Sequence, residues 1–176
     1  MSPRDIGLVL LVVIIWGVNF VAIRWGVDEV PPLLLTALRY VVAALPAIFL
    51  IRRPQVALGL LVAYGLAVGV CQFGLLFAAI KLGMPAGLSS LVMQLQAFFT
   101  IALAVLFLRE RPRPEQLAGA LIAFAGIGVI AAERVGGAVL PPLLMTIAAA
   151  FFWGVANIIT KRAGRIDMLG FVVWSS

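Results

Sequence analysis

The sequence predicts an all-α protein embedded in a membrane, and three features of its composition and pattern indicate this. Of its 176 residues, 64 % are hydrophobic, whereas a soluble domain carries about 45–50 %. Only 11 % are charged, against about 25 % in a typical soluble protein. The charges separate long uncharged stretches, several of which reach the roughly 20 residues that a spanning helix needs. Lipid is therefore the expected environment of the chain.

Five uncharged stretches, and a sixth that contains only Arg39, give the expected spanning helices. Glycine, proline and clustered charges mark the turns between them. The predicted helices cover about residues 6–26, 33–51, 56–80, 86–108, 116–132 and 138–160. A last apolar run begins at residue 168 and stops after nine residues, at Ser176. Nine residues are too few to span a bilayer, so the chain is expected to end inside a seventh helix.

The basic residues predict the orientation, because cytoplasmic loops are enriched in Lys and Arg. With the N-terminus in the cytoplasm, nine basic residues fall on the inner side and three on the outer side. The nine are Arg4, Arg52, Arg53, Arg109, Arg111, Arg113, Lys161, Arg162 and Arg165, and the three are Arg24, Lys81 and Arg134. We therefore expect a multi-pass protein of the cell inner (plasma) membrane with a cytoplasmic N-terminus.

The composition also excludes several kinds of chemistry. Without histidine the chain has no Ser-His-Asp site and no His-ligated metal. The single cysteine, Cys71, cannot form a disulfide within the chain. The basic residues flank apolar runs instead of forming one patch, which indicates a membrane surface and not a nucleic acid. We expect no enzyme, no cofactor and no metal.

A short motif occurs twice, once in the first predicted helix and once in the sixth. The first copy is Trp16-Gly17-Val18-Asn19 and the second is Trp153-Gly154-Val155-Ala156-Asn157, and an arginine follows each asparagine by five residues. Because the copies are five helices apart, the two helices cross the membrane in opposite directions. This pattern is typical of the inverted-topology repeats of secondary transporters, although Trp-Gly pairs also recur by chance.

Four segments extend this pattern to nearly the whole chain. They are WGVNFVAIRWG at 16–26, PPLLLTALRYVVAALPAIF at 31–49, MPAGLSSLVMQLQAFFTIALAVLFLRERP at 84–112 and QLAGALIAFAGIGVI at 116–130. In order and spacing they resemble the EamA-type transporters of the drug/metabolite transporter superfamily. The overall match looks closest to bacterial exporters of O-acetylserine and cysteine.

The resemblance implies both an architecture and a function. Members of the family have ten helices in two inverted five-helix repeats. Residues 1–136 would form the first EamA repeat and residues 137–176 the start of the second, so the chain looks C-terminally truncated. The implied function is a secondary, carrier-type transporter that exports small amino-acid-like metabolites such as cysteine or O-acetylserine. The alternative is a non-transporting membrane module or remnant that needs a partner chain to form a pathway.

Polar side chains inside the predicted fourth helix are candidates for a substrate pathway. At about 100° per residue, one face of a straight helix would hold Ser89, Met93, Gln96 and Thr100, with Ser90 and Gln94 beside it. Amides in hydrocarbon need partners, so this face should point toward a wet cavity or toward another helix. Substrate binding and interhelical hydrogen bonding both remain open for it.

The same two interpretations apply to the other polar residues in the helices. Gln72 lies midway along the third helix, and the two motif copies add Trp16, Asn19, Trp153 and Asn157 as pathway candidates. Arg39 lies roughly 9 Å below the outer end of the second helix. Its side chain either extends to the interface or pairs within the protein, or it attracts the carboxylate of an amino-acid-like substrate. The expected partners are thus the lipid bilayer and a small polar or zwitterionic metabolite.

Overall fold

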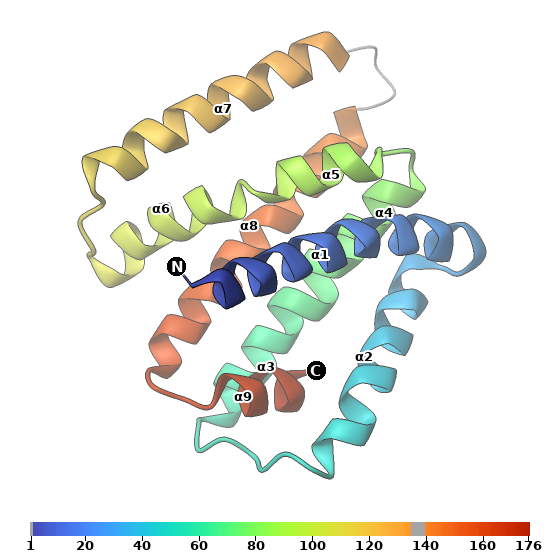
Figure 1. The fold of residues 1–176 in the computed structure, drawn as a ribbon, viewed down its shortest axis with the longest axis vertical. Coiled ribbons are helices and arrows are strands. Elements are labelled where there is room, and N and C mark those ends of the chain that lie inside the picture. The colour runs from blue at the N-terminus through green and yellow to red at the C-terminus, as the bar shows by residue number, and fades with distance from the viewer. Residues whose placement is uncertain (1, 135–139) are drawn as a thin grey trace.

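The computed structural model describes residues 2–134 and 140–176, and the elements in these ranges are helices (Figure 1). Their bounds are α1 Pro3–Glu29, α2 Pro32–Ile48, α3 Leu58–Gly65, η1 Leu66–Phe73, α4 Gly74–Lys81, α5 Ala86–Met93, α6 Gln96–Leu108, α7 Pro114–Arg134, α8 Leu140–Ala163 and α9 Met168–Ser175. The element η1 is a π-helix that joins α3 and α4 into one continuous rod.

Within residues 2–134 and 140–176, four helical segments are long and apolar enough to cross a membrane. They are Arg4–Glu29, Leu58–Lys81, Ala86–Leu108 and Leu140–Ala163. Two shorter apolar helices, Pro32–Ile48 and Pro114–Val129, accompany them. The prediction of an all-α membrane protein is confirmed. The expected helices are present to within a few residues, except that the first two residues of the predicted helix 138–160 lie outside the described residues.

Local sequence explains where several helices begin and end. At the start of α1, Ser2 Oγ accepts a hydrogen bond from the Asp5 backbone N–H at 3.2 Å, and Asp5 Oδ2 accepts one from the Ser2 N–H at 2.9 Å. This reciprocal capping box satisfies two N–H groups that the helix leaves free. Asp167 caps α9 in a similar way, accepting from the N–H groups of Leu169 and Gly170. The helix α2 ends at Ile48, three residues before its predicted end, with Pro46 in its last turn.

The predicted fourth helix is not one straight α-helix. It divides into α5 and α6 at Gln94 and Leu95, whose N–H groups bond to Leu91 and Val92 three residues back, at 3.1 and 3.0 Å. These tight turns change the rotation per residue from the α-helical value. Ser90, Met93 and Gln94, up to the break, line the cavity described below, whereas Gln96 and Thr100, after it, bond to Asn157 in α8.

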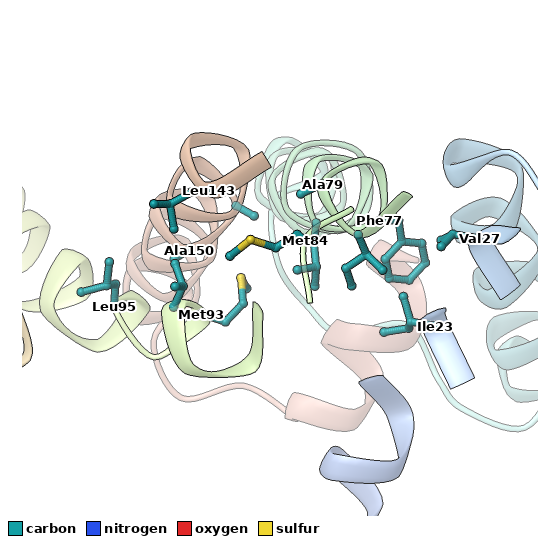
Figure 2. Close-up of a cluster of buried hydrophobic side chains, with 13 residues drawn as sticks. Ile23, Val27, Phe77, Ala79, Met84, Met93, Leu95, Leu143 and Ala150 are labelled. Atoms are coloured by element: carbon teal, nitrogen blue, oxygen red, sulfur yellow. The ribbon is translucent and has the colours of Figure 1, made fainter. Parts of the chain in front are cut away.

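Helix α8 is the centre of the bundle, since it packs against α3, η1, α4, α5 and α6. The main apolar core lies between α1, α4, α5 and α8, and Figure 2 shows Met84 and Met93 between α4 and α8. Its buried members are Ile23, Val27, Leu76, Phe77, Ala79, Ile80, Met84, Val92, Met93, Leu95, Leu143, Ala149 and Ala150. Helix α7 runs along the outer side of α6 (Figure 1), where Phe124 meets Phe98 with ring centroids 6.0 Å apart.

Candidate functional site

A cavity of about 390 Å³ lies between α1, α2, the α3–η1–α4 rod, α5, α8 and α9. Eight residues singled out in the sequence line it: Trp16, Asn19, Arg39, Gln72, Ser90, Met93, Gln94 and Trp153. They come from helices that are far apart in the chain, so the fold itself brings them together. Such a mixture of apolar walls and a few polar groups is typical of sites for small molecules.

The two tryptophans of the repeated motif meet at this cavity. The ring centroids of Trp16 in α1 and Trp153 in α8 lie 5.6 Å apart, with 49° between the ring planes. Aromatic pairs prefer such tilted arrangements over parallel stacking. The equivalent positions of the two motif copies therefore form one wall of one site.

The charge of the cavity comes from Arg39. Its Cζ lies 4.3 Å from the ring centroid of Phe73, a cation–π contact. Phe73 in turn meets the ring of Tyr40 nearly edge-on at 6.2 Å. Among the described residues that line the cavity, Arg39 is the only one with a charged side chain.

Gln72 is the most deeply buried polar side chain of the cavity wall, at 3 % exposure. It lies in η1, and π-helical turns inside membrane or soluble helices are frequent at functional sites. Its Oε1 has no hydrogen-bond partner within the described parts of the chain. A buried amide oxygen without a partner is costly, and this oxygen is itself shielded from solvent by the surrounding protein.

Three other candidates lie away from the cavity and bond to each other. Asn157 Nδ2 donates to Gln96 Oε1 and to Thr100 Oγ1, both at 2.9 Å. Thr100 Oγ1 donates in turn to the Gln96 backbone carbonyl at 2.7 Å. This cluster joins α6 to α8. For these residues the structure thus shows interhelical hydrogen bonding, one of the two interpretations left open for the polar face. The remaining candidate, Ser89, is fully buried, and its Oγ has no partner in the described structure.

Sequence reasoning missed two tyrosines. Tyr40 and Tyr64 both line the cavity, and the ring of Tyr64 also meets that of Phe171 at 5.0 Å between centroids. They are the only tyrosines in the sequence, and both lie within predicted spanning helices. A phenol inside a membrane helix needs a polar partner. The position of both tyrosines within predicted spanning helices could therefore have identified them as candidates.

Comparison with known proteins finds a transporter family and relatives named as transporters. Residues 4–132 match the EamA-like transporter family. The chain is 46 % identical over 182 residues to a probable amino-acid metabolite efflux pump of Salmonella typhimurium, and 45 % identical over 182 residues to one of Escherichia coli. A probable terminal-alkyne amino-acid exporter of Streptantibioticus cattleyicolor is 28 % identical over 181 residues and covers 98 % of this chain.

These alignments cover 100 % of this chain for the first two relatives and 61 % of the length of each of the three. The chain thus spans about 61 % of the length of these relatives. No solved structure is a significant match. Because the family match covers most of the chain, from residue 4 to residue 132, the chain belongs to the EamA-like transporter family.

Proposed function

We propose that the chain forms the substrate pathway of a secondary, carrier-type transporter that exports small amino-acid-like metabolites such as cysteine or O-acetylserine. The observation that carries this proposal is the cavity of about 390 Å³, in which polar residues from six parts of the bundle meet. Polar and charged groups inside a membrane are costly and generally mark substrate or ion pathways. Relatives named as efflux pumps and exporters support a carrier and not an enzyme.

The cavity has the size and composition that a small zwitterion needs. Its volume falls within the range of about 300–1,000 Å³ of sites for small molecules. Arg39 provides a fixed positive charge, since an arginine side chain stays protonated. Asn19, Gln72 and Gln94 add neutral amides, and the tryptophan pair adds an apolar surface. A substrate with one carboxylate and one ammonium group matches this set.

Uptake by vesicles tests the proposal. Lipid vesicles that contain only the 176-residue chain should accumulate labelled L-cysteine in exchange for unlabelled L-cysteine above the level of empty vesicles. Trp16→Ala should reduce this exchange because it removes one wall of the cavity. Trp25→Ala is the matched control on the same helix, since Trp25 is 71 % exposed and does not line the cavity. Exchange no greater than in empty vesicles would overturn the proposal for this chain and favour the partner-dependent module.

We also infer that the N-terminus is cytoplasmic, in the inner membrane, and that residues 1–136 and 137–176 belong to two inverted repeats. The Lys and Arg distribution and the contact between Trp16 and Trp153 support this. In a Cys71→Ala background, a cysteine at Leu82 should react with an impermeant thiol reagent added outside the cell. Cysteines at Arg53 and Arg111 should react only after permeabilisation. The reverse pattern would contradict both the orientation and the inverted repeat.

A further inference from the structure

A second hollow lies next to the cavity, beside α2. It is a groove of about 820 Å³ between α2 and the α3–η1 part of the rod, and α2 packs against the rod at η1. The walls of the groove are mostly apolar. Several of its side chains are more than half exposed on the outside of the bundle, namely Val41, Leu45, Val62, Leu66 and Val70. The groove therefore opens toward the lipid, whereas the cavity holds the polar groups.

The two spaces share part of their lining. Among the described residues, four line both the cavity and the groove: Tyr40, Gly65, Ser175 and Ser176. At Gly65 the boundary is backbone against backbone, because a Cβ atom there would collide with the Ser175 carbonyl oxygen. The Ser175 hydroxyl donates to the Phe171 carbonyl at 2.6 Å. Tyr40 is thus the one large side chain on this boundary.

The ring of Tyr40 reaches from α2 to η1. A Cβ atom at Gly69 would lie 3.3 Å from Tyr40 Cε2 and 3.7 Å from its Cζ, so the far end of the ring lies against the bare backbone of η1. The same ring meets that of Phe73 nearly edge-on, with centroids 6.2 Å apart. Gly69 lines only the groove and Phe73 only the cavity. The ring therefore lies between the two spaces.

A ring in this position limits the length of a substrate in the cavity. An apolar chain on a substrate gains free energy in proportion to the apolar surface that it buries, and the groove offers such surface. With the ring in place, the chain has to fit inside the cavity of about 390 Å³. Without the ring, the same chain would extend into the groove while the polar end of the substrate stayed in the cavity.

We propose that Tyr40 determines specificity by closing the polar cavity against the lipid-facing groove, so that amino-acid-like substrates with short side chains are accepted and those with long apolar side chains are rejected. The proposal rests on the proposed function and adds to it an upper limit on the length of the substrate side chain. The limit comes from the ring and not from the phenol hydroxyl. The same ring keeps lipid acyl chains out of the cavity.

A series of S-alkyl-L-cysteines tests this limit: the S-methyl, S-butyl and S-octyl compounds, which share their amino-acid end. Binding is measured from the rise in the unfolding midpoint of the chain in lipid nanodiscs. The wild type should bind the S-octyl compound more weakly than the S-butyl compound. In Tyr40→Ala this order should reverse, because the octyl chain then buries its surface in the groove. The ratio of the two affinities should change by about tenfold or more.

Two variants serve as controls. Tyr40→Phe keeps the ring and should keep the wild-type order. Leu45→Ala removes a side chain that lines the groove and not the cavity. It widens the groove without opening the boundary, so it should also keep the wild-type order. If Tyr40→Ala does not fold, Tyr40→Leu makes the same test, because its shorter side chain does not extend across Gly69.

The outcomes separate this proposal from the proposed function. If vesicles exchange L-cysteine but the variants without the ring keep the wild-type order, Tyr40 does not set the limit and export stands. The same conclusion follows if the wild type already prefers the S-octyl compound, or if Leu45→Ala also reverses the order. If the wild type neither binds nor exchanges L-cysteine, both proposals are overturned. Reversal in the variants without the ring, with Tyr40→Phe and Leu45→Ala unchanged, supports the limit.

Discussion

Helices α1 and α8 carry the same Trp-Gly motif, yet they have different surroundings in the protein. Only 6 % of the spanning window in α1 is buried inside the protein, against 39 % in α8. Both tryptophans line the cavity, but the neighbouring residues of the motif diverge. In α8 the glycine and asparagine of the motif pack against or bond to α6. In α1 the asparagine faces the cavity and the glycine has no neighbour within 4 Å. The same residue types thus take their roles from what packs against them.

The glycines and asparagines of the motif make this difference concrete. A Cβ atom at Gly154 would lie 2.9 Å from Phe99 Cβ and 3.1 Å from the Thr100 nitrogen, while one at Gly17 would meet nothing within 4 Å. Asn157 bonds to α6, whereas Asn19 lines the cavity. The motif in α8 therefore permits a close helix crossing, which its counterpart in α1 does not make.

The largest expected effect is that of Gly154→Ala. Neither the Cβ of Phe99 nor the backbone of α6 can move without separating the two helices, and overpacking of this kind costs about 1–3 kcal/mol. The midpoint of unfolding in lipid nanodiscs should fall clearly. Gly17→Ala is the matched variant, and its midpoint should stay the same or rise, since alanine favours a helix over glycine. Equal losses in both variants would contradict the comparison.

The next effect separates the asparagines. Asn157→Leu removes two hydrogen bonds between α8 and α6 and leaves the Gln96 amide without its partner. Hydrogen bonds between membrane helices contribute roughly 0.6–2 kcal/mol, so the unfolding midpoint should fall. Asn19→Leu should leave the midpoint nearly unchanged and reduce the exchange of L-cysteine instead. If both variants change the unfolding midpoint and the exchange of L-cysteine to the same extent, the two asparagines do not have different roles.

The sequence predicted the fold class and the helix positions well, because both depend on composition and on the length of apolar runs. It did not separate the polar residues that line the cavity from those that bond to α8, and the cause is local. The tight turns at Gln94 and Leu95 and the π-helical segment η1 leave no trace in a pattern of apolar residues. Assuming a straight helix therefore grouped Met93, which lines the cavity, with Gln96, which bonds to α8.

A smaller effect tests this division within the former polar face. Gln94 precedes α6 and lines the cavity, whereas Gln96 begins α6 and accepts from Asn157. Gln94→Leu should reduce the binding of L-cysteine without a large change in the unfolding midpoint. Gln96→Leu should lower the free energy of unfolding by about 1 kcal/mol. The binding of L-cysteine should fall only in proportion to the loss of folded protein. If both variants lose binding equally and unfold normally, the face acts as one unit and the division is wrong.

The smallest effect concerns the basic residues that follow each motif copy. Lys161 Nζ lies 2.8 Å from Glu110 Oε2, joining the end of α8 to the segment after α6. Arg24 instead donates from Nη1 to the Ile80 carbonyl at 2.7 Å, and its contact with Asp28 is longer, at 3.6 Å. Because Lys161 and Glu110 are each nearly half exposed, water and salt screen their attraction, and such pairs contribute about 0.2–1 kcal/mol.

Glu110→Gln should therefore lower the unfolding midpoint slightly at low ionic strength, and this difference from the wild type should vanish at high salt. Asp28→Asn should have a still smaller effect, since Arg24 keeps its hydrogen bond to the backbone carbonyl of α4. Free energies of unfolding measured at two salt concentrations for Glu110→Gln, for Lys161→Met and for the variant with both substitutions give the coupling between Lys161 and Glu110 directly. A loss in Glu110→Gln that persists at high salt would mean that Glu110 acts through packing and not through charge, and that the end of α8 is held no differently from the end of α1.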